Sequence, residues 1–291
     1  MTHTLKNESL ALQVESRGAE IVSLKTAQGR EAIWYGEPRY WDRHAPLLFP
    51  CVGGNWEGQI RVEGQAYPLV KHGFVQDMEF ELVEQTAERL TLSLCDTPAT
   101  RQSFPFAFRL TVSYTLQGNT LDVTWKVENP AETTMSFMIG AHPAFLLPKF
   151  SAEDAVHGYL RFPEVDCLRS TPTLPRGYTH PEQEELFPLE DHLLPLTNQA
   201  FLCDTILDTT GRISRVELLD ASRQRLITMQ FQMPVLAMWA PEGGCSPFVC
   251  IEPWYGLCDT EGYTGEFSDR PYINNVRAHE TWECKYSMTV E

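Results

Sequence analysis

Residues 108–128 read FRLTVSYTLQGNTLDVTWKVE, and this stretch decides the fold class. Apolar and polar side chains alternate over residues 108–116, and the alternation returns over 121–127 after the sequence Gln117-Gly118-Asn119. A period of two places one set of side chains on a core and the other towards solvent, which is typical of a β-strand. Two such runs joined by a short Gly/Asn turn predict an antiparallel β-hairpin.

The same pattern recurs outside the hairpin. It covers residues 90–95, and over residues 281–290 apolar side chains at even positions alternate with polar ones at odd positions. Hardly any segment keeps a helical period over three turns, so crossover helices are not expected. Many strands without such helices predict an all-β fold of mainly antiparallel sheets, arranged as a sandwich or a barrel.

One region departs from this pattern. Because proline fixes φ and removes a backbone donor, the proline-rich stretch 148–195 predicts irregular chain with at most short strands. A linker between two domains is one interpretation, but the alternation resumes after this stretch without a change in composition. We therefore expect a long excursion over the face of a single domain that spans residues 1–291. The prolines in question are Pro163, Pro172, Pro175, Pro181 and Pro188.

The bulk composition limits the partners. Of the 291 residues, 39 are acidic and 23 are basic, for a net charge of −16. Such a chain repels nucleic acid and anionic membranes, so a small ligand is expected. That ligand should be neutral, unless a local basic pocket binds an anionic one. No apolar run approaches the roughly 20 residues that span a bilayer, and the N-terminus does not read as a signal peptide. The eight cysteines lack the spacing of a zinc site and suit reduced thiols in the cytoplasm.

Three segments place titratable side chains in apolar, glycine- or proline-flanked surroundings: 71–74, 139–145 and 248–256. In the first, a glycine follows His72 and lets the backbone turn or approach a ligand closely. In the second, the following proline keeps His142 on extended chain. In the third, Glu252 ends an apolar run, where partial desolvation raises a carboxyl pKa towards the range useful for a base.

Each of these residues also has a plain structural interpretation. A lone histidine on an apolar strand is more often a hydrogen-bonded core residue, and a glutamate before Pro-Trp is more often a cap or an ion-pair partner. Two histidines and a glutamate also suit a mononuclear metal site, but the three are far apart in sequence and show no ligand spacing, so no metal is expected. Aromatic side chains near these loops could stack on a pyranose ring or simply fill the core. They are Trp34, Tyr40, Trp41, Trp239, Trp254 and Tyr255.

Short motifs in a fixed order carry a resemblance to a known family. They are GAEIVSL at 18–24, IW at 33–34, YW at 40–41, APLLFP at 45–50, HGF at 72–74, GAHPAF at 140–145 and CIEPWYG at 250–256. Each motif is weak alone, but their joint order is specific. The chain resembles the aldose 1-epimerase (galactose mutarotase-like) family, in particular its LacX-like branch.

The resemblance implies a galactose mutarotase-like β-supersandwich and an enzyme that interconverts the α and β anomers of a free hexose or related aldose. It implies that Glu252 is the base that takes the proton of the anomeric hydroxyl, and that His142 is the acid that protonates the ring oxygen. Opposite protonation states are expected at rest, with Glu252 ionised and His142 able to donate. No cofactor is expected, because the reaction has no redox step. The predicted sugar-binding residues are His72, Asp204, Lys71, Trp239 and Trp254.

The chain also departs from the family pattern. Members of the branch usually carry arginine within the stretch that here reads Gly53-Gly54-Asn55, and again where this chain has Lys71 and Gln76. Loss of these arginines argues against a sugar phosphate unless Lys71 or Arg270 substitutes. A hexose-6-phosphate 1-epimerase and a non-catalytic carbohydrate-binding protein are the alternatives. The oligomeric state is not encoded in any pattern we find.

Overall fold

The central hairpin forms as predicted. The structure is a computed structural model that describes residues 1–174 and 177–291. Strands β9 (Arg109–Gln117) and β10 (Thr120–Glu128) pair in antiparallel register from Gln117↔Thr120 to Arg109↔Glu128. Along both strands every second side chain is buried. Gly118 in the connecting turn has φ +58°, a conformation that costs glycine little.

The hairpin lies within a nine-stranded antiparallel sheet, in which β10 also pairs with the C-terminal strand. The sheet therefore joins the middle of the chain to its end. Its order is β17 (Leu193–Leu196), β14 (Gly158–Arg161), β19 (Arg215–Asp220), β20 (Arg225–Phe231), β24 (Thr281–Val290), β10, β9, β8 (Arg89–Cys95) and β7 (Glu81–Gln85).

An eight-stranded sheet provides the second large layer. Every residue of its strand β22 except the last is buried, so both faces of that strand are covered. The sheet order is β16 (Glu185–Pro188), β15 (Cys167–Ser170), β18 (Thr205–Asp208), β21 (Val235–Trp239), β22 (Phe248–Tyr255), β12 (Ile139–Ala141) and β4 (Leu47–Leu48), while β13 (Ala144–Leu146) also pairs with β22.

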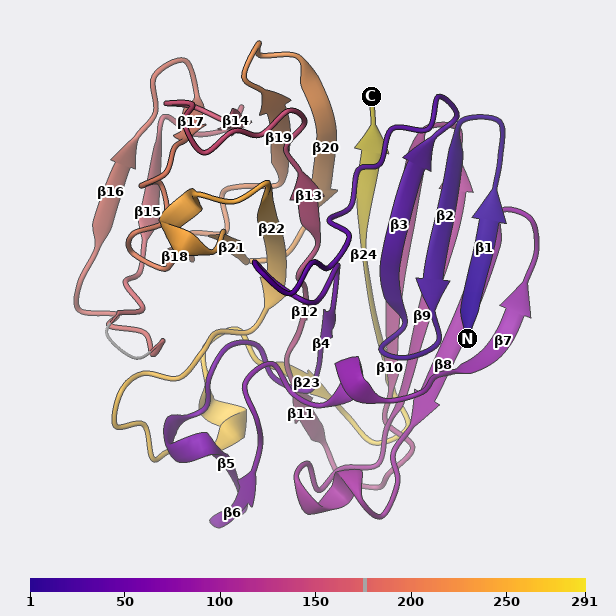
Figure 1. Ribbon diagram of the computed structural model, residues 1–291. Helices are drawn as coiled ribbons and strands as arrows, with labels where there is room; N and C mark the ends of the chain where they lie inside the picture. The colour runs from indigo at the N-terminus through magenta and orange to yellow at the C-terminus, as the bar shows by residue number, and fades with distance from the viewer. Residues whose placement is uncertain (175–176) are drawn as a thin grey trace.

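Smaller elements complete the fold. Figure 1 shows β1 (Thr2–Lys6), β2 (Leu10–Glu15) and β3 (Glu20–Thr26) lying across β8 and β9. The Tyr114 hydroxyl of β9 donates a hydrogen bond to the Ala19 carbonyl beside β3, which ties the two layers together. Two further two-stranded antiparallel sheets pair β5 (Gln59–Val62) with β6 (Gln65–Pro68) and β11 (Met135–Phe137) with β23 (Asn274–Val276).

Helical structure is limited to single turns. Within the described residues the helical elements are the 3₁₀ turns η1 (Trp56–Gly58), η2 (Val75–Asp77), η3 (Thr100–Gln102), η4 (Glu242–Gly244) and η5 (Phe267–Asp269). None of these is long and apolar enough to cross a membrane. The prediction of an all-β, mainly antiparallel fold is thus confirmed.

The proline-rich stretch 148–195 forms only strands of four residues, as expected. It supplies the outer strands of both large sheets: β17 and β14 to one, β16 and β15 to the other. The outermost strands β16 and β17 contain Pro188 and Pro195, and an edge strand is where the missing backbone donor is tolerated. Pro175 lies outside the described residues. One hydrophobic cluster contains buried side chains from both large sheets, and the single-domain organisation stays a prediction.

Candidate active site

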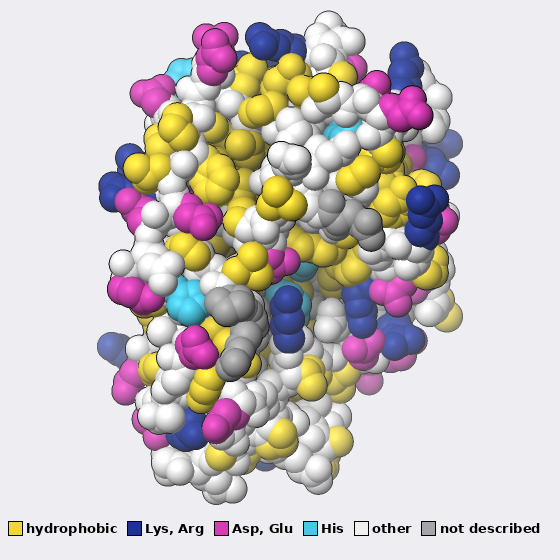
Figure 2. All heavy atoms as spheres, turned by 60° about the vertical axis from the view of Figure 1, so that its left-hand side comes forward, with side chains coloured by type: hydrophobic (Ala, Val, Ile, Leu, Met, Phe, Trp, Pro, Cys, Tyr) yellow, Lys and Arg dark blue, Asp and Glu magenta, His cyan; other side chains and the backbone are white. Residues whose placement is uncertain are grey.

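A cavity of about 320 Å³ opens over the eight-stranded sheet, at the lower end of the sizes typical of small-molecule sites. Figure 2 shows a hollow in this face where histidine side chains lie beside a Lys or Arg side chain. The sequence-predicted site residues come from five separate segments of the chain, and all seven line this cavity. They are Lys71, His72, His142, Asp204, Trp239, Glu252 and Trp254.

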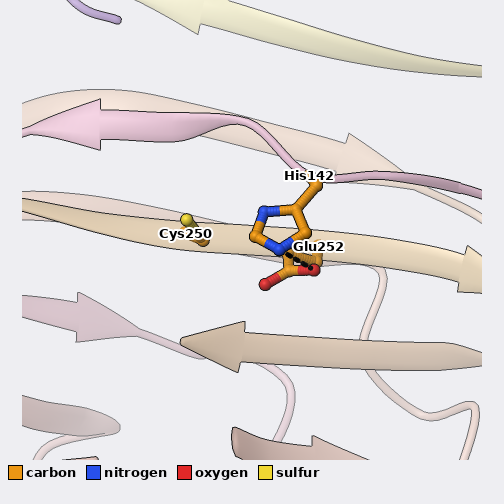
Figure 3. Close-up of side chains that lie close together, drawn as sticks. All are labelled: His142, Cys250 and Glu252. Carbon is orange, nitrogen blue, oxygen red and sulfur yellow. Dashed lines mark ion pairs between the residues drawn. The ribbon is translucent and has the colours of Figure 1, made fainter. Parts of the chain in front are cut away.

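Strand pairing places the two predicted catalytic residues face to face. Gly140 of β12 pairs with Trp254, and Ala144 of β13 pairs with Cys250, both on β22. Midway between these pairs, His142 falls opposite Glu252. The imidazole Nε2 lies 3.2 Å from the carboxyl Oε2, and Figure 3 shows the two groups pointing towards one another. The proline after His142 disfavours a helical backbone at this residue.

The pair is buried and incompletely hydrogen-bonded. Glu252 is 1% exposed and His142 is 8% exposed. Glu252 Oε2 has no hydrogen-bond partner, so its 3.2 Å contact with His142 Nε2 is not a hydrogen bond. The other imidazole nitrogen, His142 Nδ1, also has no hydrogen-bond partner. Buried polar atoms are rarely left unpaired, and each one costs about 1–3 kcal/mol. A sugar hydroxyl entering the cavity would satisfy these groups.

Burial also decides the charge states in the empty cavity. It raises the pKa of Glu252 well above its usual range; the nearby Lys71 opposes this rise and Asp204 adds to it. Burial lowers the pKa of His142 to about 3, with Lys71 and Arg43 acting in the same direction. Both shifts favour neutral groups. From the sequence, Glu252 is expected to be ionised at rest. Burial disfavours that ionised form until a ligand binds.

His72 lies in a turn between β6 and η2. Its φ is +66°, in the left-handed region that non-glycine residues rarely adopt. The Gly53 N–H donates to His72 Nδ1 at 3.0 Å, and the His72 N–H donates to the Gly53 carbonyl at 3.0 Å. Gly73 cannot be replaced easily, because a Cβ there would lie 2.0 Å from the Phe49 carbonyl oxygen. The turn thus fixes the imidazole edge-on to His142, with ring centroids 5.6 Å apart.

The remaining predicted residues occupy the walls. Asp204 precedes β18 and also has a left-handed backbone, with φ +70°. Trp239 lies on β21, beside β22. The Trp254 indole packs over Gly140, and its Nε1 donates to the Ala141 carbonyl at 3.2 Å. Lys71 is exposed and lines the cavity.

Sequence reasoning missed Arg43, which lines the cavity from the irregular chain before β4 and pairs with Asp77 at 3.0 Å. It lies between the motifs at 40–41 and 45–50, and that position was the sequence signal that could have pointed to it. Of the aromatic side chains noted above, Trp41 lines the cavity and stacks on His142, with ring centroids 4.8 Å apart. Trp34 is instead fully buried in a small apolar cluster, and Tyr255 packs against Trp282.

The suggestion that Arg270 replaces a missing arginine is wrong. Its guanidinium is buried, pairs with Asp259 at 2.8 Å, and donates to the Asn55 side chain and the Leu257 carbonyl. All of its donor groups are directed at the protein rather than at a ligand. Among residues 1–174 and 177–291, Lys71 is left as the candidate for that role.

Comparison with known proteins agrees with this geometry. The sequence profile described as aldose 1-epimerase matches residues 1–270. The chain belongs to the aldose 1-epimerase family. The plasmid and chromosomal LacX proteins of Lactococcus lactis subsp. lactis are each 30% identical over 309 aligned residues, covering 100% of this chain and 99% of the relative.

Solved structures show the same family fold. A galactose mutarotase related enzyme from Lactobacillus acidophilus is 30% identical, with a TM-score of 0.93 over 100% of this chain and 97% of that chain. A galactose mutarotase-like protein from Lactobacillus casei is 26% identical, with a TM-score of 0.92 over 100% of both chains. The predicted galactose mutarotase-like fold is therefore confirmed, and the family implies a sugar ligand. The roles of individual residues stay predictions.

One group of side chains in this aldose 1-epimerase family member offers the ligand types of a metal site. Atoms of His142, Cys250 and Glu252 lie within 4.8 Å of one another, and Figure 3 shows the three side chains together. Tetrahedral zinc holds such ligands roughly 3.5 Å apart, so the side chains would have to move closer. Burial also raises the pKa of the Cys250 thiol well above its usual range, which opposes the thiolate that a metal needs. The residues present do not fit a metal as they are held.

The shift at His142 predicts an acid-sensitive stability. The unfolded chain protonates this imidazole near its ordinary pKa of about 6.5, whereas the folded protein does so only at about 3. Between these values the unfolded state binds more protons, so the free energy of unfolding falls as pH falls, by up to about 1.4 kcal/mol per pH unit. In His142→Asn this contribution disappears, and urea unfolding at several pH values should give a flatter profile.

The control is His279→Asn, which removes an exposed histidine. The backbone at position 279 has a positive φ, and asparagine tolerates that conformation. Its profile should match that of the wild type. Making both substitutions in Glu252→Gln removes the opposite contribution of Glu252, which contacts His142, from the comparison. Equal slopes in the wild type and His142→Asn would contradict the burial of a neutral imidazole.

Proposed function

We propose that the protein is an aldose 1-epimerase that interconverts the α and β anomers of a free hexose or related aldose. The observation that carries the proposal is the buried pair of Glu252 and His142, 3.2 Å apart and not hydrogen-bonded to each other, on the floor of a sugar-sized cavity. Mutarotation requires one proton acceptor and one proton donor across a hemiacetal, and this pair supplies both. Each such group contributes on the order of 10²–10⁴-fold in rate.

The pair carries one transferable proton whichever group holds it. We infer that a bound sugar moves this proton onto His142, because hydroxyl donors then stabilise the Glu252 carboxylate that burial alone disfavours. The indole of Trp41, stacked on the imidazole at 4.8 Å, offers a π face to the imidazolium. A carboxylate base and an imidazolium acid result only when the ligand is present.

In the proposed reaction, Glu252 takes the proton of the C1 hydroxyl while His142 gives its proton to the ring oxygen. The C1–O5 bond breaks and an aldehyde forms at C1. Rotation about C1–C2 presents the other face, and reclosure returns both protons by the reverse transfers. The wall residues Trp239 and Asp204 would hold the pyranose face and its hydroxyls. The eight free cysteines fit a reducing compartment, which supports a cytoplasmic location.

Freshly dissolved α-glucose and α-galactose, followed by polarimetry at pH 7, test the proposal. The protein should speed the approach to the same final anomer ratio. Glu252→Gln and His142→Asn should each lose on the order of 10²–10⁴-fold of this acceleration. The same substitutions at exposed positions, Glu182→Gln and His279→Asn, should lose none. If the protein binds sugar but does not speed the mutarotation of any aldose, the proposal is wrong and the protein is a non-catalytic carbohydrate-binding protein.

A second candidate, a hexose-6-phosphate 1-epimerase, is favoured by one observation. Lys71 and Arg43 both line the cavity in a protein whose net charge is −16. Asp77 offsets the charge of Arg43, which leaves Lys71, within the part of the chain that the structure describes, to receive an anionic group. An ammonium recognises phosphate as a point charge rather than through a bidentate contact.

Comparing glucose with glucose 6-phosphate decides between the two candidates. If the phosphate is the substrate, Lys71→Gln should raise its KM about tenfold, the equivalent of one charge-assisted contact, and raise the KM of glucose less. Lys25→Gln, on an exposed side chain, is the control. If the protein prefers glucose, and Lys71→Gln does not alter that preference, the sugar phosphate is excluded as the substrate.

A further inference from the structure

Thr173 carries a buried hydroxyl that the protein does not satisfy. The residue is 4% exposed, and among residues 1–174 and 177–291 its Oγ1 has no hydrogen-bond partner. Thr173 lines the same cavity as Glu252 and His142, although it lies outside every motif that carries the family resemblance. Because buried polar atoms are rarely left unpaired, an unpaired hydroxyl beside a cavity indicates a contact for a ligand.

The order of the strands places Thr173 at the end of the cavity away from the catalytic pair. Glu252 is on β22, and β21 separates that strand from β18. Neighbouring strands lie about 4.8 Å apart, so β18 runs roughly 10 Å from Glu252. This interval is of the size of one sugar ring with its hydroxyls. Thr173 follows β15, the strand on the far side of β18.

Backbone hydrogen bonds hold the chain on both sides of Thr173. The Thr171 N–H donates to the carbonyl of Leu207, a residue of β18 that also lines the cavity, at 2.9 Å. The Thr173 carbonyl accepts the Gly177 N–H at 2.7 Å. A side chain on backbone held in this way loses little freedom when a ligand binds to it, which favours affinity.

The geometry of the ring determines which sugar hydroxyls reach this end. In the proposed reaction the C1 hydroxyl lies at Glu252 and the ring oxygen lies at His142, so the C1–O5 bond lies over the catalytic pair. The bond opposite C1–O5 in a six-membered ring is C3–C4. The hydroxyls on C3 and C4 are therefore directed away from the pair, towards β18 and Thr173.

We propose that the Thr173 hydroxyl hydrogen-bonds a hydroxyl on the C3–C4 edge of the sugar and selects among aldoses that differ at these carbons. The proposal rests on the proposed function for the direction in which the ring lies. Asp204 lines the same cavity, but a carboxylate can only accept a hydrogen bond, whereas the Thr173 hydroxyl can also donate one. Inverting C3 or C4 moves its oxygen relative to this fixed hydroxyl, so one epimer is bound better than the other.

Thr173→Val replaces the hydroxyl by a methyl group of similar size, and its effect on the empty protein is the first test. The urea midpoint of unfolding should stay the same or rise, because the hydroxyl that is removed has no protein partner. Thr179→Val is the matched control, since Thr179 is 1% exposed and its hydroxyl hydrogen-bonds the Cys258 carbonyl and the Thr260 hydroxyl. There the midpoint should fall.

An equal fall in Thr173→Val and Thr179→Val would overturn the proposal, because it would assign the Thr173 hydroxyl a structural role. No sugar is present in this measurement, so its outcome does not depend on whether the protein is a mutarotase.

Calorimetric titration with glucose, galactose and their 3-deoxy and 4-deoxy forms tests the contact itself and requires no turnover. Thr173→Val should weaken binding of the hexose that binds more tightly by about tenfold, the equivalent of one hydrogen bond. Of the two deoxy forms of that hexose, the one that lacks the contacted hydroxyl should bind Thr173→Val and the wild type equally. Thr173→Ser keeps the hydroxyl and should retain most of the affinity.

Equal weakening for the hexose and for both of its deoxy forms, or no weakening for the hexose, would overturn the proposal. If the affinities follow the expected pattern and the protein speeds the mutarotation of no aldose, the contact at Thr173 stands and the proposed function is wrong.

Discussion

The site depends on one cross-strand relationship. β12 and β13 are two short strands on a single neighbouring segment, and both pair with β22. The chain between them holds His142 and Pro143, and the pairing places His142 opposite Glu252. Because β22 is buried along almost its whole length, the two groups meet where water does not screen them. An acid and a base on one rigid element pair need no loop movement to reach each other.

Placing ionisable groups there has a cost that the rest of the structure must offset. Glu252 and His142 each bury a polar atom that has no protein partner, and His72 and Asp204 add left-handed backbones beside them. Such conformations cost on the order of 1–3 kcal/mol each and persist only where the surroundings enforce them. Here the enforcing elements are the two large sheets and the buried Asp259–Arg270 pair. Several unfavourable features around one cavity are typical of a functional site rather than of a structural core.

Much of this could be predicted from sequence because the relevant signals are local. Period-two alternation sets the hairpin 108–128, and Pro143 disfavours a helical backbone at His142. The motif order indicated the family, and with it the seven residues that line the cavity. Other features depend on long-range contacts that no local pattern encodes. Arg43 reaches the cavity from irregular chain, and the proline-rich stretch adds edge strands to two sheets.

Charge states were the least predictable part. A sequence indicates that Glu252 is flanked by apolar residues, but not that it and His142 are both withdrawn from solvent. The most direct test of the whole account is a crystal structure of Glu252→Gln soaked with α-glucose or α-galactose. We predict a pyranose in the cavity, with the C1 hydroxyl within hydrogen-bond distance of residue 252 and the ring oxygen facing His142. A sugar bound elsewhere, or bound with C1 directed out of the cavity, would contradict the account.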